Sequence, residues 1–325
     1  MGKYILKRIL IMIPVLLGVI VVIFSINFIS PNDPAIAILG SSATEESIAE
    51  LHAEMGLDRP YFVQLLDYIE DVVFHFDLGT SYQSGRPVSE MILERFPTTF
   101  KLGILSLILS VLIGMPLGIL SATKQYSLLD YSSTILALIG TSVPSFWLGL
   151  MMMILFSVKL GWLPASGLET WKHWIMPVVA VGIFPIANIM RTTRSSMLEV
   201  IRQDYIRTAR SKGLSYREVI TGHALRNALI PVITVVGIQL GLVLGGTMVL
   251  EMIFSIPGLG VLTRKAITAG DYPVIQGTVL FSAFIISVVN LLVDIIYTFV
   301  DPRLKSRFSS KKKTRVKAEE GGAES

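Results

Sequence analysis

Six long apolar runs constrain this 325-residue chain more than any other feature of its sequence. They cover residues 9–29, 102–122, 131–158, 174–190, 229–250 and 277–300, and the only charge inside them is Asp294 in the last run. An α-helix rises about 1.5 Å per residue, so about 20 residues cross a hydrocarbon core about 30 Å thick. The runs therefore predict an all-α integral membrane protein with six transmembrane helices, in which 9–300 form the membrane domain.

The composition agrees with a membrane chain and excludes several classes of site. Charged residues make up 16% of the sequence, against about 25% in soluble domains. The chain has no cysteine, and its four histidines include no pair at i, i+4, so we expect no metal site and no cofactor. The positive charge flanks the apolar runs, which indicates contact with membrane lipid and no nucleic acid.

Two of the runs need separate interpretation. The first follows three basic residues and precedes an Ala35-Ile36-Ala37 sequence, as in a secretory signal, but it exceeds the usual core of about 7–15 residues. We interpret it as a retained helix. The run 174–190 is the shortest and contains Pro177 and Pro185, which predicts a kinked or protein-enclosed helix.

The distribution of Lys and Arg predicts the orientation in the cell (inner, cytoplasmic) membrane. With six spans and both ends inside, 20 of the 28 basic residues fall on the cytoplasmic side. Positive residues accumulate on that side, so both termini are expected in the cytoplasm. Residues 1–8 then form a cytoplasmic N-terminus, and 301–325 form a basic cytoplasmic tail that is polar enough to be disordered.

An external segment, 30–98, separates the first two spans. It carries twelve acidic residues and three basic ones. Ser42 and Glu45 have the spacing of a capping box, Gly56 can end that helix, and Pro60 suits the first turn of a second one. We expect a small helical cap that either packs against the external loops or forms a docking surface for an extracellular partner.

The cytoplasmic loop 191–228 has the pattern of two short helices. Apolar residues recur at helical spacing up to Ala209, Gly213 interrupts the pattern, and Ser215 can cap a second helix. The small Ala209 and the flexible Gly213 would let the groove of a partner approach the backbone closely. Spacing alone leaves open whether the loop docks a partner or packs under its own bundle.

Five further positions could contribute to a gate or a path. Asp294 would cost about 2.5–3.5 kcal/mol at a helix centre, so it should find a donor in the protein or in water. Glu251 precedes Pro257 and Gly258, and could tie that turn together or line an outer gate. Pro144 interrupts helix hydrogen bonds in a span, either as a kink or beside a transport cavity.

The sequence predicts no catalytic residues. It contains no Gly-x-x-x-x-Gly-Lys-[Ser/Thr] sequence, so the chain has no recognisable phosphate-binding loop of its own. An intramembrane enzyme lacks a converging catalytic set, and a secondary transporter usually needs more ionisable groups at mid-bilayer than Asp294 alone.

Several sequence motifs, in order along the chain, resemble the permease subunits of peptide-type ABC importers. These motifs are Lys7-Arg8, Gly56-Leu57-Asp58, Asp77-Leu78-Gly79-Thr80-Ser81, Pro144-Ser145-Phe146-Trp147-Leu148-Gly149, Gly161-Trp162-Leu163-Pro164, the run from Asp204 to Leu214, the run from His223 to Pro231, Glu251 through Gly260, Asp271-Tyr272-Pro273 and Asp301-Pro302-Arg303. In the wider superfamily the loop reads Glu-Ala-Ala, three residues, Gly. Here Arg207 and Thr208 replace its first two positions, while Ala209 and Gly213 remain.

This resemblance implies a type I ABC importer permease fold with cytoplasmic coupling helices. The implied partners are a second homologous permease, two cytoplasmic ABC ATPases and an extracytoplasmic substrate-binding protein. The implied ATPase-coupling residues are Asp204, Tyr205, Arg207, Thr208, Ala209, Lys212, Gly213, Leu214, His223, Arg226 and Asn227. The implied substrates are di- or oligopeptides, with glutathione, nickel or oligosaccharides as alternatives.

Overall fold

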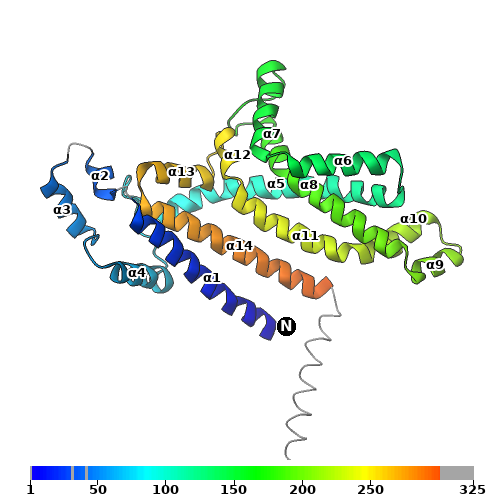
Figure 1. The fold of residues 1–325 in the computed structure, drawn as a ribbon, viewed down its shortest axis with the longest axis horizontal. Helices are drawn as coiled ribbons and strands as arrows, with labels where there is room; N and C mark the ends of the chain where they lie inside the picture. The colour runs from blue at the N-terminus through cyan, green and yellow to red at the C-terminus, as the bar shows by residue number, and fades with distance from the viewer. Residues whose placement is uncertain (1, 31–32, 41–42, 301–325) are drawn as a thin grey trace, which may run out of the picture.

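The computed structural model describes residues 2–30, 33–40 and 43–300, so the basic tail 301–325 lies outside the described residues. Helices dominate these ranges, and an isolated β-bridge joins Thr80 to Pro87. The all-α prediction is therefore confirmed. In Figure 1 the helices α9 and α10 lie at the right-hand end and α2–α4 at the left-hand end. We call these the loop end and the cap end.

Five helical segments are long and apolar enough to cross a membrane. They are α1 (Gly2–Ile29), α5 (Val88–Thr123), α8 (Lys172–Ile201), the segment Tyr216–Gly246 that ends in α11 (Leu225–Gly246), and α14 (Tyr272–Val300). Each contains all or nearly all of one predicted apolar run.

The predicted span 131–158, which Pro144 was expected to interrupt, is a bent pair of helices. It divides into α6 (Leu128–Ser142) and α7 (Ser145–Met152), which continues as the π-helix η2 (Met153–Lys159), and the two halves meet at 102°. Pro144 lies at the break, where it lacks an amide proton and cannot continue α6. The described chain therefore has five candidate spans, or six if the bent pair crosses as one.

Helix α8 is the most enclosed of the candidate spans, as expected for 174–190. It continues through both prolines, and 56% of its most apolar stretch is buried, against 11% for α1 and α14. α8 lies beside α5 (Figure 1), where Gly118 permits a close approach. A Cβ at Gly118 would come within 2.6 Å of the Met190 carbonyl oxygen. Small residues at such contacts let two helix backbones pack directly.

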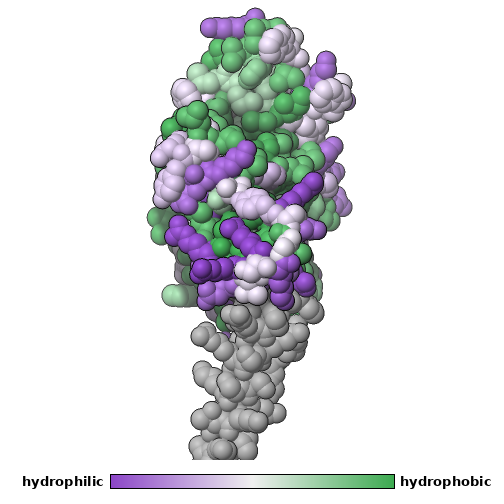
Figure 2. All heavy atoms as spheres, turned by 90° about the vertical axis from the view of Figure 1, so that its right-hand side faces the viewer, coloured by the Kyte–Doolittle hydropathy of each residue, from purple (hydrophilic) through white to green (hydrophobic). Residues whose placement is uncertain are grey.

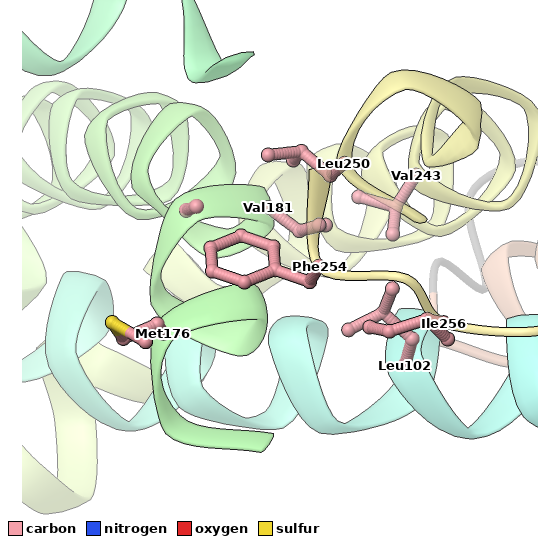
Figure 3. Packing of buried hydrophobic residues seen from close by; sticks show 8 residues of the cluster. Leu102, Met176, Val181, Val243, Leu250, Phe254 and Ile256 are labelled. Carbon is pink, nitrogen blue, oxygen red and sulfur yellow. The ribbon is translucent and has the colours of Figure 1, made fainter. Parts of the chain in front are cut away.

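A hydrophobic cluster joins α5, α8 and α11 to the short α12 (Met248–Ile253). Figure 3 shows the Phe254 ring between side chains from α8 and α5, with Ile256 beside Leu102. The buried members are Leu102, Met176, Ala180, Val181, Val243, Leu250, Phe254 and Ile256. This cluster fixes the turn that follows the fifth span.

The helical cap expected in 30–98 is present as α2 (Pro34–Leu39), α3 (Glu45–Glu54), α4 (Tyr61–Glu70) and the π-helix η1 (Asp71–His75). The predicted N-cap of α3 is wrong, because Thr44, not Ser42, accepts the hydrogen bond from the Ser47 amide. Thr44 directly precedes the first helical residue, where a side-chain oxygen reaches a free amide of the first turn. Gly56 adopts φ +66° after α3, as predicted.

Pro60 immediately precedes α4 instead of lying inside its first turn. At the same cap end, α13 (Leu259–Ala269) follows the turn that contains Pro257 and leads into α14.

Candidate coupling surface and its supporting clusters

The loop 191–228 folds as two short helices joined at a glycine, as predicted. α8 ends at Ile201, α9 spans Asp204–Ser211, and α10 (Tyr216–Glu218) continues through the π-helix η3 (Val219–Ala224) into α11. Ser215 and Glu218 form a complete capping box at the start of α10. Gly213 has φ +84°, a left-handed conformation that a residue with a side chain adopts at a cost.

One face of α9 packs into the chain itself. Ile206 and Ala209 are buried in a cluster with Met197 of α8 and with Val219 and Ile220 of η3. The expectation that Ala209 faces a partner is therefore wrong, because its small side chain is used in this internal contact. Gly213 is exposed, and no atom lies within 4 Å of the position of an added Cβ.

The opposite face of the two helices is exposed and mixes positive and apolar side chains. Its members, which we call the loop surface, are Tyr205, Arg207, Thr208, Arg210, Lys212, Gly213, Leu214 and Tyr216. Figure 2 shows hydrophilic side chains gathered over this end of the molecule. The Arg210 guanidinium lies 5.6 Å from the centre of the Tyr216 ring. Arg210 and Tyr216 are absent from the predicted coupling set, although they flank the predicted glycine.

The other predicted coupling residues surround this surface. Asp204 is exposed at the start of α9, and His223, Arg226 and Asn227 are exposed on η3 and α11. The Asn227 amide donates a hydrogen bond of 2.8 Å to the Tyr205 hydroxyl. Every predicted coupling residue except Ala209 is therefore exposed at the loop end.

An ion pair between the buried Asp130 and the partly exposed Arg194 lies behind the loop end. Arg194 of α8 donates two hydrogen bonds to Asp130 of α6, from Nε to Oδ1 at 2.7 Å and from Nη2 to Oδ2 at 2.9 Å. The Asp130 carboxylate also accepts bonds from the Ser121 hydroxyl and from the Tyr126 amide. This cluster joins α5, α6 and α8 at one point, two turns before α8 ends.

Glu251 is fully buried and ties the cap-end turn together. Its carboxylate accepts hydrogen bonds from Thr99 Oγ1 at 2.7 Å, Thr247 Oγ1 at 2.9 Å and the Gly260 amide at 2.8 Å. A Cβ at Gly258 would lie 2.5 Å from this carboxylate. Glu251, Gly258 and the adjoining Pro257 therefore lie in a packed structural cluster.

Asp294 has the donor that its position in an apolar span requires. Arg8 of α1 reaches both its carboxylate oxygens, with Nη1 to Oδ2 at 2.9 Å and Nη2 to Oδ1 at 3.1 Å. Both residues are partly exposed. The pair joins the first helix to the last.

Two of the distant motifs meet at the cap end. The Ser81 hydroxyl and the Tyr82 amide both donate hydrogen bonds to Asp271. Burial, together with the nearby Asp271 carboxylate, raises the pKa of Tyr82 to about 12. This contact fixes the end of the cap against the start of α14.

Two family models match the chain. Residues 114–306 match the binding-protein-dependent transport system inner membrane component, and residues 1–103 match the N-terminal part of such components.

Curated relatives are similar over nearly the whole chain. The dipeptide transport system permease protein DppB of Alkalihalophilus pseudofirmus is 44% identical, covering 94% of this chain and 100% of its own. A putative peptide transport system permease protein of Brucella abortus is 45% identical over 94% of this chain and 99% of its own. The glutathione transport system permease protein GsiC of Salmonella choleraesuis is 44% identical with the same coverage.

Solved structures share the fold. An inward-facing structure of the MetNI methionine ABC transporter has a TM-score of 0.55 at 19% identity, covering 66% of this chain and 97% of that one. An amino acid ABC transporter with histidines has a TM-score of 0.51 at 15% identity, covering 66% and 94% respectively.

Proposed function

We infer the function of this chain from the family to which it belongs, the inner membrane components of binding-protein-dependent transport systems. It is a multi-pass membrane permease subunit of an ABC importer, a complex that contains other subunits. The membership argues against the secondary-transporter alternative, since these systems depend on a separate binding protein.

The transported substrate that we propose is a short peptide. Relatives at 44–45% identity are named for dipeptides and peptides, and one is named for glutathione, which is itself a tripeptide. Peptide import is therefore the main proposal and glutathione its alternative. The names of these three relatives mention neither nickel nor oligosaccharides, so those alternatives gain no support from them.

The loop surface is the proposed docking site of a cytoplasmic ATPase subunit. The observation that carries this proposal is an exposed face of positive and apolar side chains, supported by a buried core of Ile206, Ala209 and Val219. An ATPase bound there would hold two spans at once, because α9 follows α8 directly and α10 leads without a break into α11. ATP-driven movement of the loop would then move both spans, as alternating access requires.

The full complex that we propose contains a second homologous permease, two ATPases and an extracytoplasmic binding protein. This chain would be its non-catalytic membrane subunit. The Arg194–Asp130 pair would transmit movement of α8 to α5 and α6, because it links all three helices.

The proposed function predicts ATP-dependent peptide uptake by the whole complex only. Proteoliposomes that contain all subunits should accumulate a labelled di- or tripeptide when ATP and the binding protein are supplied. The purified chain alone should neither bind nor hydrolyse ATP. Stoichiometric ATP binding by the isolated chain, or peptide uptake that continues without any ATPase subunit, would contradict this division of labour.

The proposed orientation places the loop end in the cytoplasm and the cap end outside. Because the natural chain has no cysteine, single cysteines can report on each side. In intact cells or spheroplasts, an impermeant thiol reagent should label Ser84→Cys at the cap end and should leave Lys124→Cys unlabelled until the membrane is opened. Both positions are exposed in the folded chain. Labelling of Lys124→Cys from outside would reverse the orientation.

A further inference from the structure

The cap helix α4, together with the π-helix η1 that continues it, packs against the side of the first span. Leu65 of α4 shares a buried cluster with Ile20 and Phe24 of α1, and Val72 of η1 packs against the same cluster. The Tyr68 ring stacks on the Phe24 ring, with 6.0 Å between their centres. This part of the cap is therefore held along α1 and not only at its end.

These contacts lie deep along α1. Its apolar run ends at residue 29, whereas Phe24 and Ile20 come five and nine residues earlier. At about 1.5 Å per residue they lie about 8 and 14 Å inside that end, and half of a hydrocarbon core is about 15 Å thick. A helix that packs at this depth cannot lie wholly outside a membrane that α1 spans.

Two other faces of α4 and η1 differ in polarity. Gln64, Asp67 and Asp71 recur at i, i+3 and i+7, so they share one face, and all three line a cavity of about 680 Å³ at the cap end. Phe62 and Leu66 are four residues apart on a different face and do not line this cavity. One side of the helix therefore faces a polar cavity, and another presents apolar side chains.

The apolar side is uncovered in this chain. Phe62, Leu66, Phe74 and Phe76 are between 64% and 84% exposed. Phe76 ends η1 with φ +54°, a left-handed conformation that is unfavourable for a residue with a side chain. Large apolar groups exposed together indicate contact with a protein or with a membrane.

Lipid is the partner that fits the position of this surface. The surface adjoins α1, whose most apolar stretch is 11% buried and whose Val22 and Ile26 side chains are exposed on either side of Phe24. Lipid chains cover such side chains on a span. A protein in the aqueous phase does not reach the depth of Phe24, so the exposed apolar side of α4 continues the lipid-facing surface of α1.

We propose that α4 and η1 form an interfacial helix in the outer leaflet of the membrane, with the four exposed apolar side chains against phospholipid and the polar face toward the cavity. An amphipathic helix of this kind buries its apolar face about 5–10 Å into the boundary between headgroups and chains. The proposal is independent of the transported substrate, and only the choice of leaflet rests on the proposed orientation.

Fluorescence quenching in lipid nanodiscs tests the proposal on the assembled importer. The other subunits carry serine in place of any cysteine, and this chain, which has none, carries one cysteine labelled with the fluorophore NBD. Leu66→Cys and Phe74→Cys are the tested positions. Val22→Cys on α1 is the control for lipid contact and Ala49→Cys on α3 the control for water, because both side chains are exposed.

Phosphatidylcholine with brominated chains should quench Leu66→Cys and Phe74→Cys about as strongly as Val22→Cys, and their emission should shift to shorter wavelength as it does at Val22. Iodide in the water should quench Ala49→Cys and leave the other three nearly unchanged. Quenching of the two tested positions by iodide, as at Ala49, would place the helix in water and overturn the proposal. Quenching by neither agent would show that another protein covers the surface, which would overturn it equally.

Discussion

An Arg194→Met substitution is expected to destabilise the folded chain by about 2–3 kcal/mol, less than the cost of about 3–5 kcal/mol for a fully buried ion pair, because the Arg194 side chain is 28% exposed. Asp130 is 3% exposed, and its carboxylate would keep bonds from Ser121 and the Tyr126 amide but lose both bonds from Arg194. The remaining charge would then be buried with two hydrogen bonds but without a positively charged partner. Thermal unfolding of the purified chain in detergent, followed by size-exclusion fluorescence, measures the loss.

A double substitution supplies the matched control. Asp130→Leu together with Arg194→Met removes both charges and leaves side chains of similar volume, so most of the lost stability should return. Replacing a buried pair by apolar residues is often neutral. If the single variant unfolds at the same temperature as the wild type, the pair does not hold α5, α6 and α8 together.

The membrane helices could be predicted because their signal is local. Each apolar run is long enough to span by itself, and five of the six correspond to a single continuous helical segment. The helix ends could not be read in the same way. α5 begins at Val88, well before the apolar run 102–122. Its first part carries Glu90, Glu94 and Lys101, and hydropathy assigns such a charged stretch to a loop.

The run 131–158 shows a different limit. Pro144 marked the position of a break, but a proline can be accommodated with or without a large change of direction. Pro177 and Pro185 lie inside one continuous α8, whereas Pro144 separates two helices at 102°. Packing of Gly149 against Leu250 and Phe254 decides the direction of α7, and that contact joins residues about a hundred positions apart.

The two short helices of the loop were predicted, but the face of α9 that packs into the chain was not. Ile206 and Ala209 are three residues apart in α9 and therefore lie on the same face of the helix. That spacing is the sequence signal that Ala209 is buried with Ile206 against the chain itself. The Asp130–Arg194 pair had no comparable signal, since its partners are 64 residues apart. A single sequence does not show which acidic residue a given arginine will reach.

Substituting Leu214 by Glu is expected to separate the ATPase from the permease while leaving the membrane domain folded. Leu214 is 39% exposed in this chain, beside the accessible backbone of Gly213. If an ATPase groove buries the exposed part of Leu214, Leu214→Glu loses that apolar contact and its carboxylate is also desolvated, so the cost is about 1 kcal/mol or more, at least about fivefold in affinity. Co-purification of the ATPase and ATP-driven uptake should both fall, at normal expression and unchanged melting temperature.

Two controls define the interpretation of that result. Ser84→Glu adds the same charge at the opposite end and should change neither measurement. Ala209→Glu should behave differently from Leu214→Glu, because it puts a charge into the buried cluster and should lower the stability of the chain itself. A Leu214→Glu chain that retains both the ATPase and transport would show that this surface is not the docking site.

Direct cross-linking of the loop surface tests the central claim most directly. A cysteine at Lys212, exposed between α9 and α10, is joined by a short photoactivatable linker to whatever lies against it in the assembled importer. We expect one product that contains this chain and the ATPase subunit, sharply reduced when Leu214→Glu is added and absent from Ser84→Cys. No ATPase product from Lys212→Cys, or equal amounts from Lys212→Cys and Ser84→Cys, would contradict the claim that α9 and α10 couple this permease to its ATPase.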